Sequence, residues 1–245
     1  MLGMTTTNDP GTTGVKDIAV ALGGGIRENS LILIEGEAKS GKSVISRHIA
    51  YGVLRSRESS VAYYSAEENS ETLLAQMESM SLDARHDLVT DRLRVFKMGS
   101  RDVLRNAEKS LQLIINHIEE LPERFKLVIV DSATPFMDKV SPVAKMDFLQ
   151  ACKELCDQER SIVLALDSHV FEVKSLVRAY AMSDYYLRLR SQDMLLETGQ
   201  VDTRVIKLLE VTKLRGAECP SHEGIKFEIK SGMSIQILPF LRVKI

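Results

Sequence analysis

The sequence predicts an α/β protein whose central, mostly parallel sheet is covered by helices on both faces, with antiparallel strands near the C-terminus. Two observations lead to this prediction. Short, largely unbroken apolar runs alternate with stretches of helical periodicity over most of the chain, and closely spaced strand-like runs follow after about Ser191. Strand–helix alternation is typical of parallel sheets that have helices on both faces. Strands joined by short connections favour antiparallel pairing.

Five apolar runs have the length and composition of buried parallel strands. They are residues 31–35, 61–65, 127–131, 162–167 and 185–189. Three later runs are expected to extend one edge of the sheet in antiparallel fashion. They are residues 205–211, 225–229 and 235–238, with a turn at 230–232 between the last two.

Helices are expected between the strands, where apolar residues recur near the 3.6-residue period. The expected helices are residues 43–55, 70–80, 103–118, 142–157 and 172–182. Asn69, Ser70 and Glu71 form a plausible helix start, because an Asn side chain can accept a hydrogen bond from an amide of the first turn.

Composition limits the classes of protein that the chain can belong to. The 245 residues are 44% hydrophobic and 27% charged with a net charge of -2, which does not suit a strongly basic nucleic-acid binder. No apolar run approaches the ~18 residues of a membrane-spanning helix. Residues 1–14 lack the features of a signal peptide and are expected to form a flexible tail before one domain at 15–245. A cytoplasmic protein is therefore expected.

The three cysteines are too few for a disulfide scaffold. Cys152 and Cys156 are four residues apart on a predicted helix and so share one face, while Cys219 lies far away in the sequence. No further Cys or His follows at a metal-binding spacing, so buried free thiols are expected.

The segment GEAKSGKSV, residues 36–44, has the spacing G-x-x-x-x-G-K-S of a phosphate-binding loop. It lies between an apolar strand and a helical stretch, which is the setting that the motif requires. Backbone amides and the helix N-terminus would surround the phosphates of ATP, with Lys42 on the β- and γ-phosphates and Ser43 on Mg²⁺. The expected nucleotide contacts are Gly36, Glu37, Ala38, Lys39, Ser40, Gly41, Lys42, Ser43 and Val44.

Three acidic sites follow predicted strands, where an open α/β sheet binds its ligands. Asp131 ends the run KLVIVD and is expected to help hold Mg²⁺; the alternative is a helix N-cap. Glu67 and Glu68 are adjacent, and one of them can orient the attacking water; the alternative is that they only open the next helix. Asp167, Ser168 or His169 can sense the γ-phosphate, although a lone His in this position is more often structural.

Four segments together carry a family resemblance. They are LGGGIRENSLILIEGEAKSGKSV at 22–44, SAEENSETLLAQMESM at 65–80, SDYYLRLR at 183–190 and LEVTKLRGAECPSHEGIKFEIKSGMSIQILP at 209–239. These segments resemble RecA-fold proteins of the KaiC type, and among these the archaellum motor accessory ATPases, the FlaH or ArlH family. The phosphate loop alone is generic, but the combination is specific and spans roughly residues 15–245.

The resemblance implies one RecA-like domain that binds ATP and forms a homo-oligomeric ring, expected as a hexamer. It implies a cytoplasmic place at the archaellum base, with the motor ATPase and the membrane platform protein as partners and no nucleic acid. It implies a nucleotide-gated scaffold that regulates assembly or rotation, with slow hydrolysis or none. By position, Asp131 is the Walker-B acid and Glu67 or Glu68 takes the catalytic-glutamate place. Lys213 and Arg215 match a pair that reaches a neighbour's γ-phosphate; the alternative is a solvated strand edge.

Two other functions stay open at the level of sequence. One is a DNA-acting recombinase paralogue on the same fold, but its expected DNA loops, 134–147 and 168–178, have few cations for a phosphate track. The other is a phosphotransfer regulator of the KaiC kind, which needs an acceptor Ser or Thr near a neighbour's site.

Overall fold

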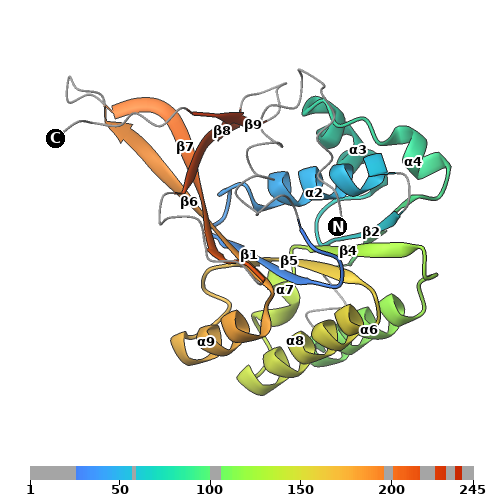
Figure 1. The fold of residues 1–245 in the computed structure, drawn as a ribbon. Helices are drawn as coiled ribbons and strands as arrows, with labels where there is room; N and C mark the ends of the chain where they lie inside the picture. The colour runs from blue at the N-terminus through green and yellow to red at the C-terminus, as the bar shows by residue number, and fades with distance from the viewer. Residues whose placement is uncertain are drawn as a thin grey trace.

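Figure 1 shows the fold as a computed structural model, which describes residues 26–56, 59–99, 106–195, 201–215, 224–229 and 235–238. The described strands form one nine-stranded sheet in the order β3-β2-β4-β5-β1-β6-β7-β8-β9. The strands are β1 (Leu31–Gly36), β2 (Ser60–Ser65), β3 (Leu93–Lys97), β4 (Phe125–Asp131), β5 (Ser161–Asp167), β6 (Tyr185–Leu195), β7 (Val201–Lys213), β8 (Ile225–Ile229) and β9 (Ile235–Ile237). The helices are α2 (Lys42–Ser56), α3 (Ser70–Ser79), α4 (Arg85–Val89), α6 (Ala107–Glu119), α7 (Thr134–Met137), α8 (Pro142–Asp157) and α9 (Val173–Met182).

Strands β1 to β6 pair in parallel, and β6 to β9 pair with antiparallel neighbours. Helices α2, α3 and α4 lie on one face of the sheet, and α6, α8 and α9 lie on the other (Figure 1). Alternate residues of β1 show how both faces are buried. Ile32 and Ile34 pack in the core beneath α2, and Leu31 and Leu33 pack in the core beneath α6 and α8. The predicted fold class is therefore confirmed.

Strand β1 lies between β5 and β6, and β4 lies between β2 and β5. Parallel strands end at the same edge of a sheet, so the segments that follow β1, β2, β4 and β5 meet there. Strands β6 and β7 form a long antiparallel pair that extends well beyond the core (Figure 1). This pair continues past the end of β1 and brings the C-terminal strands to the phosphate loop.

Several elements differ from the expected ones. Strand β3 was not predicted, because its sequence LRVFK is short, is interrupted by charged residues and lies at the sheet edge. The short helices α4 and α7 were also missed, since five and four residues are too few to show a period. Helix α6 begins at Ala107, with the Asn106 side chain as N-cap, and the expected earlier turn at 103–105 lies outside the described residues.

The expected tail at 1–14, the turn at 230–232 and Cys219 also lie outside the described residues. Cys152 and Cys156 are buried, free thiols on α8, as predicted, and burial raises the pKa of both. Among the described helices, none combines the length and apolar character needed to cross a membrane.

Candidate functional site

The phosphate loop connects β1 to the N-terminus of α2, as the sequence predicted. Gly41 has a φ of 107°, and a Cβ on Gly36 would lie 2.4 Å from the Ser40 Oγ and 2.7 Å from the Leu189 carbonyl oxygen. Glycine is therefore required at both positions by backbone conformation or by close packing. The Ser40 Oγ is fully buried and has no hydrogen-bond partner among the described residues.

Lys42 is the first residue of α2 and is 8% exposed. Its Nζ donates to the carbonyl oxygens of Gly36 at 2.9 Å and Glu37 at 2.8 Å, and it pairs with the Asp167 Oδ1 at 2.7 Å. An ammonium has three protons to donate, so these three acceptors use all of them. In this arrangement Lys42 stabilises the loop itself, and it must exchange partners to bind a phosphate.

Asp131 lies at the end of β4 and is 7% exposed. The Ser43 Oγ donates to its Oδ1 at 3.0 Å, and the Tyr63 hydroxyl donates to its Oδ2. Burial raises the pKa of Asp131, and the hydrogen bonds from Tyr63 and Ser43 partly oppose this increase. Asp131 does not serve as a helix N-cap, because α7 begins after Ala133.

Glu67 and Glu68 follow β2 and lie beside the end of β4. The Ser65 Oγ accepts the amides of Glu67 at 3.4 Å and Glu68 at 3.0 Å. The Glu67 side chain is exposed, whereas Glu68 is bound by the guanidinium of Arg47 at 2.9 Å. The helix that follows is capped by Asn69, whose Oδ1 accepts the Thr72 amide at 2.9 Å, so neither glutamate is its N-cap.

The residues after β5 divide between the site and the surface. Asp167 contacts Lys42 directly, as described above, and its backbone amide donates to the Thr134 hydroxyl at 2.9 Å. His169 is 63% exposed and lies 3.6 Å from the Asp138 carboxylate, so the structure does not bring it to the loop. Ser168 has no described contact that would place it at the phosphate loop.

The site fits a nucleoside triphosphate together with Mg²⁺. The loop combines the N-terminus of α2, two positions where only glycine fits, the Lys42 ammonium and a buried Ser40 hydroxyl that no described residue pairs with. The Ser43 Oγ and the Asp131 Oδ1 are hydrogen-bonded to one another, and Mg²⁺ prefers oxygen ligands of this kind. Bound Mg²⁺ would neutralise phosphate charge, and Ser43 and Asp131 are the residues that would hold it.

Residues 11–241 match the model of the ATPase family KaiC. This match covers most of the 245-residue chain. The chain belongs to the KaiC family of ATPases.

Individual relatives of this KaiC-family chain include archaeal flagellar proteins. It is 23% identical over 231 residues to the archaeal flagellar ATP-binding protein FlaH of Sulfolobus acidocaldarius, covering 93% of this chain and 96% of that protein. A FlaH from Methanocaldococcus jannaschii is 39% identical over 77 residues, 31% of this chain and 33% of that protein. These similarities confirm the resemblance to FlaH that the sequence motifs indicated.

Two further relatives define how far the similarity extends. The crystal structure of the flagellar accessory protein FlaH from M. jannaschii has a TM-score of 0.73 at 21% identity, covering 91% of this chain and 96% of that one. It confirms the RecA-like fold. The DNA repair and recombination protein RadB of Pyrococcus furiosus is 34% identical over 125 residues, 50% of each chain.

The structure places Lys213 and Arg215 of this KaiC-family chain away from its own phosphate loop. Lys213 is paired with Tyr186 near the start of β6, and its Nζ donates to the carbonyl oxygens of Tyr180 and Ala181 at 2.7 and 2.8 Å. Arg215 Nη1 donates to the Asn29 carbonyl oxygen at 2.8 Å. Both cations therefore lie at the end of the sheet where β1 and β6 begin, and the phosphate loop lies at the opposite end, where β1 finishes.

Sequence reasoning missed three residues that support the site. Tyr63 donates to Asp131, and Arg47 binds Glu68. Lys207 on β7 is 9% exposed, and its Nζ donates to the Lys39 carbonyl oxygen at 2.7 Å and the Ser191 Oγ at 2.9 Å. Arg47 carried a signal, because it is four residues after Ser43 on a predicted helix and so shares its face. Lys207 carried none, since its contact depends on the strand order.

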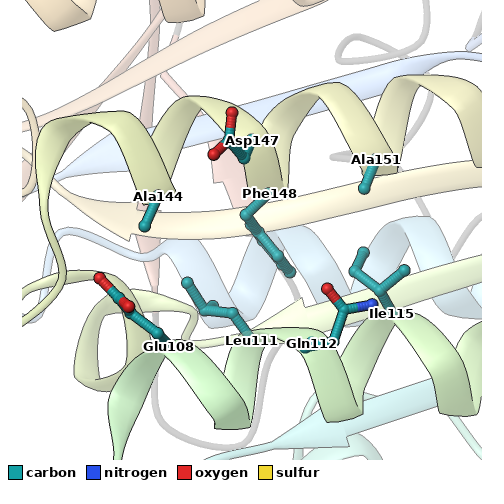
Figure 2. A pocket seen from close by; sticks show the side chains of 8 residues that line it. All are labelled: Glu108, Leu111, Gln112, Ile115, Ala144, Asp147, Phe148 and Ala151. Atoms are coloured by element: carbon teal, nitrogen blue, oxygen red, sulfur yellow. The ribbon is translucent and has the colours of Figure 1, made fainter.

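A hollow separate from the phosphate loop lies between α6 and α8, on the opposite face of the sheet from α2. Its volume is about 200 Å³, and its apolar floor includes Leu111 and Phe148 (Figure 2). Glu108 and Asp147 lie at its rim, so the nearby charge repels an anionic ligand. This hollow is therefore not an alternative phosphate site.

Proposed function

We propose that this protein binds ATP with Mg²⁺ at the phosphate loop. The observation that carries the proposal is the contact between the Ser43 Oγ and the Asp131 carboxylate at 3.0 Å, beside a loop built for phosphate. This pairing joins the two residue types that hold a nucleotide-bound metal in phosphate-loop ATPases. Calorimetric titration with ATP and Mg²⁺ tests the proposal, and absence of binding by the folded protein contradicts it.

We further propose that the protein is an accessory component of the archaeal flagellar motor. The full-length similarity to the archaeal flagellar ATP-binding protein FlaH supports this role. Its partners are then the motor ATPase and the membrane platform protein, and its place is peripheral, on the cytoplasmic side of the archaellum base. Pull-down of both partners by the tagged protein, in ATP and in ADP, tests the assignment. Tight, salt-sensitive binding of single-stranded DNA instead would favour a recombinase-like role.

ATP acts in this proposal as the signal that assembles a ring, expected as a hexamer. Lys213 and Arg215 cannot reach the phosphate loop of their own subunit, which suits a contact with the nucleotide of a neighbour. A γ-phosphate read by these cations favours the ring, and by linkage the ring binds ATP more tightly than the monomer does. The ring then presents its partner sites only in the ATP state, as a nucleotide-gated scaffold.

Sedimentation with ATP, ADP and no nucleotide tests the ring. The wild type is expected to assemble most readily with ATP, and the Lys213→Ala/Arg215→Ala double variant is not. A matched control is Lys174→Ala/Arg178→Ala, which removes two exposed cations from α9 and should assemble normally. A double variant that assembles on ATP as well as the wild type would leave Lys213 and Arg215 as residues of a strand edge.

Hydrolysis in the isolated protein is proposed to be slow and to depend on Glu67 or Glu68. Among the described residues, Lys42 and Lys207 are the cations whose charged groups contact the phosphate loop, and Lys207 is already bound to two oxygens. A cation that stabilises transition-state charge would then come from a neighbour. Fast phosphate release by the free monomer would contradict this part of the proposal.

A further inference from the structure

The two adjacent glutamates after β2 have different surroundings. The Arg47 Nη2 lies 2.9 Å from both the Oε1 and the Oε2 of Glu68, and the two side chains are 8% and 16% exposed. The Glu67 side chain is exposed and has no hydrogen-bond or ion-pair partner among the described residues. Arg47 therefore holds the Glu68 carboxylate in place, whereas no described residue holds that of Glu67.

Arg47 reaches Glu68 from the side of the site where Ser43 contacts Asp131. It follows Ser43 by four residues on α2, so both side chains lie on the same face of the helix. Ser43 donates to Asp131 from this face. The positive charge of Arg47 lowers the pKa of Asp131, and the negative charge of Glu68 raises it.

The loop that bears the glutamates is fixed to the end of β4. The Ala66 amide donates to the Asp131 carbonyl oxygen at 3.1 Å, and the Ser65 Oγ accepts the two glutamate amides. The Arg47–Glu68 pair adds the side-chain contact that joins this loop to α2. The position of Glu67 therefore depends on Glu68 and, through it, on Arg47.

We propose that Arg47 is a positioning residue, which anchors Glu68 so that Glu67 is the carboxylate that orients the attacking water. This inference rests on the proposed function. A carboxylate whose two oxygens both accept from a guanidinium cannot also turn toward a water. Glu67 has no such contact with a described residue, so its oxygens are available to the water.

The step that Glu67 serves is in-line hydrolysis of the γ-phosphate. The water oxygen forms a bond to the γ-phosphorus while the bond from that phosphorus to the β,γ-bridging oxygen breaks. ADP leaves with the electron pair of the broken bond. The Glu67 carboxylate takes the proton of the water and later releases it to solvent, so no other reactant is consumed.

Replacement of Arg47 by Lys or by Met separates the effect of its charge from the effect of its volume. One nitrogen, Nη2, spans both oxygens of Glu68, and the buried Nε of Arg47 has no hydrogen-bond partner among the described residues. A lysine keeps the positive charge and introduces no unpaired Nε, but its ammonium lies one bond short of the position of Nη2. Arg47→Lys should therefore slow phosphate release less than Arg47→Met does.

The experiment compares Arg47→Met, Arg47→Lys, Glu68→Gln, Glu67→Gln and the Arg47→Met/Glu68→Gln double variant. Three quantities are measured: ATP affinity by calorimetry, phosphate release in a single turnover with excess protein, and amide hydrogen exchange at 65–69. Arg85→Met is the matched control, because Arg85 also binds a glutamate, Glu78, but at 60% exposure and away from the site.

Glu67→Gln should slow phosphate release by about 10²-fold or more and leave exchange at 65–69 unchanged. Arg47→Met and Glu68→Gln should each slow release about tenfold, speed exchange at 65–69 and leave ATP affinity within about threefold. The double variant should be no slower than either single variant, because both remove the same contact. Arg85→Met should match the wild type in all three measurements, and Arg47→Lys should lie between the wild type and Arg47→Met.

Four results would overturn the inference. They are a larger loss of phosphate release in Glu68→Gln than in Glu67→Gln, faster release in Arg47→Met, additive losses in the double variant, and no single-turnover hydrolysis by the ATP-bound wild type. The last result would leave ATP binding by the protein intact. Absence of ATP binding in the calorimeter would instead refute the proposed function itself.

Discussion

Removal of the Lys42 ammonium is expected to weaken ATP binding. The contacts that Lys42 makes in the free protein limit the size of this effect. A charge-assisted contact contributes about 1.5–3 kcal/mol. Lys42 already has three acceptors in the free protein, among them the Asp167 carboxylate at 2.7 Å, so binding exchanges contacts rather than adding them. We therefore expect Lys42→Ala to lose about 1.5–2 kcal/mol, which is roughly a ten- to thirtyfold weaker Kd.

The same substitution should also destabilise the free protein. The carbonyl oxygens of Gly36 and Glu37 lose a donor, and Asp167 loses its cation. Leaving such groups unpaired costs about 1–3 kcal/mol. Affinity must therefore be measured by calorimetry at a temperature where urea unfolding shows that the variant is folded.

Two comparison variants make the Lys42 result interpretable. Lys174→Ala removes an exposed lysine of α9 and should bind ATP like the wild type. Asp167→Asn removes the carboxylate that competes with phosphate for Lys42 and should bind ATP at least as tightly as the wild type. A folded Lys42→Ala variant whose Kd for ATP lies within about twofold of the wild type would refute the site assignment.

Three other predictions concern separate parts of the structure. Ser43→Ala and Asp131→Asn should each reduce the dependence of ATP affinity on Mg²⁺, measured by titrations with Mg²⁺ and with EDTA. Burial lowers the pKa of His48 from 6.5 to about 4, so the unfolded chain binds more protons in that interval. Stability should therefore fall by about 3 kcal/mol as pH drops from about 6.5 to 4. Urea unfolding should show a flatter profile for His48→Leu but not for the exposed His86→Leu. Asn69→Ala should cost about 1 kcal/mol of unfolding free energy, because α3 loses its N-cap.

The sequence predicted the parallel strands and the phosphate loop because these features are encoded locally. An unbroken apolar run such as LILI in β1 has apolar side chains on both faces of the strand. It therefore indicates a strand that is buried on both faces. The loop motif likewise specifies its own backbone through Gly36 and Gly41. Strand β3 escaped prediction because it is an edge strand, and an edge strand needs fewer apolar residues.

Contacts between distant segments could not be predicted, because they depend on the order of strands in the sheet. Asp167 meets Lys42 because β5 is the neighbour of β1. Lys213 and Arg215 lie far from the loop because β7 runs antiparallel to β6, so that it ends level with the start of β6. Neither fact can be derived from the spacing of residues along the chain.

The contact between Lys207 and the Lys39 carbonyl oxygen joins residues that are 168 positions apart. A Cβ on Gly41 would likewise meet Ile229 at 3.3 Å and Phe227 at 3.7 Å, so β8 forms a wall of the loop. The phosphate loop is translated before β7 and β8. A nascent chain therefore has the nucleotide-binding motif long before it has the strands that support it.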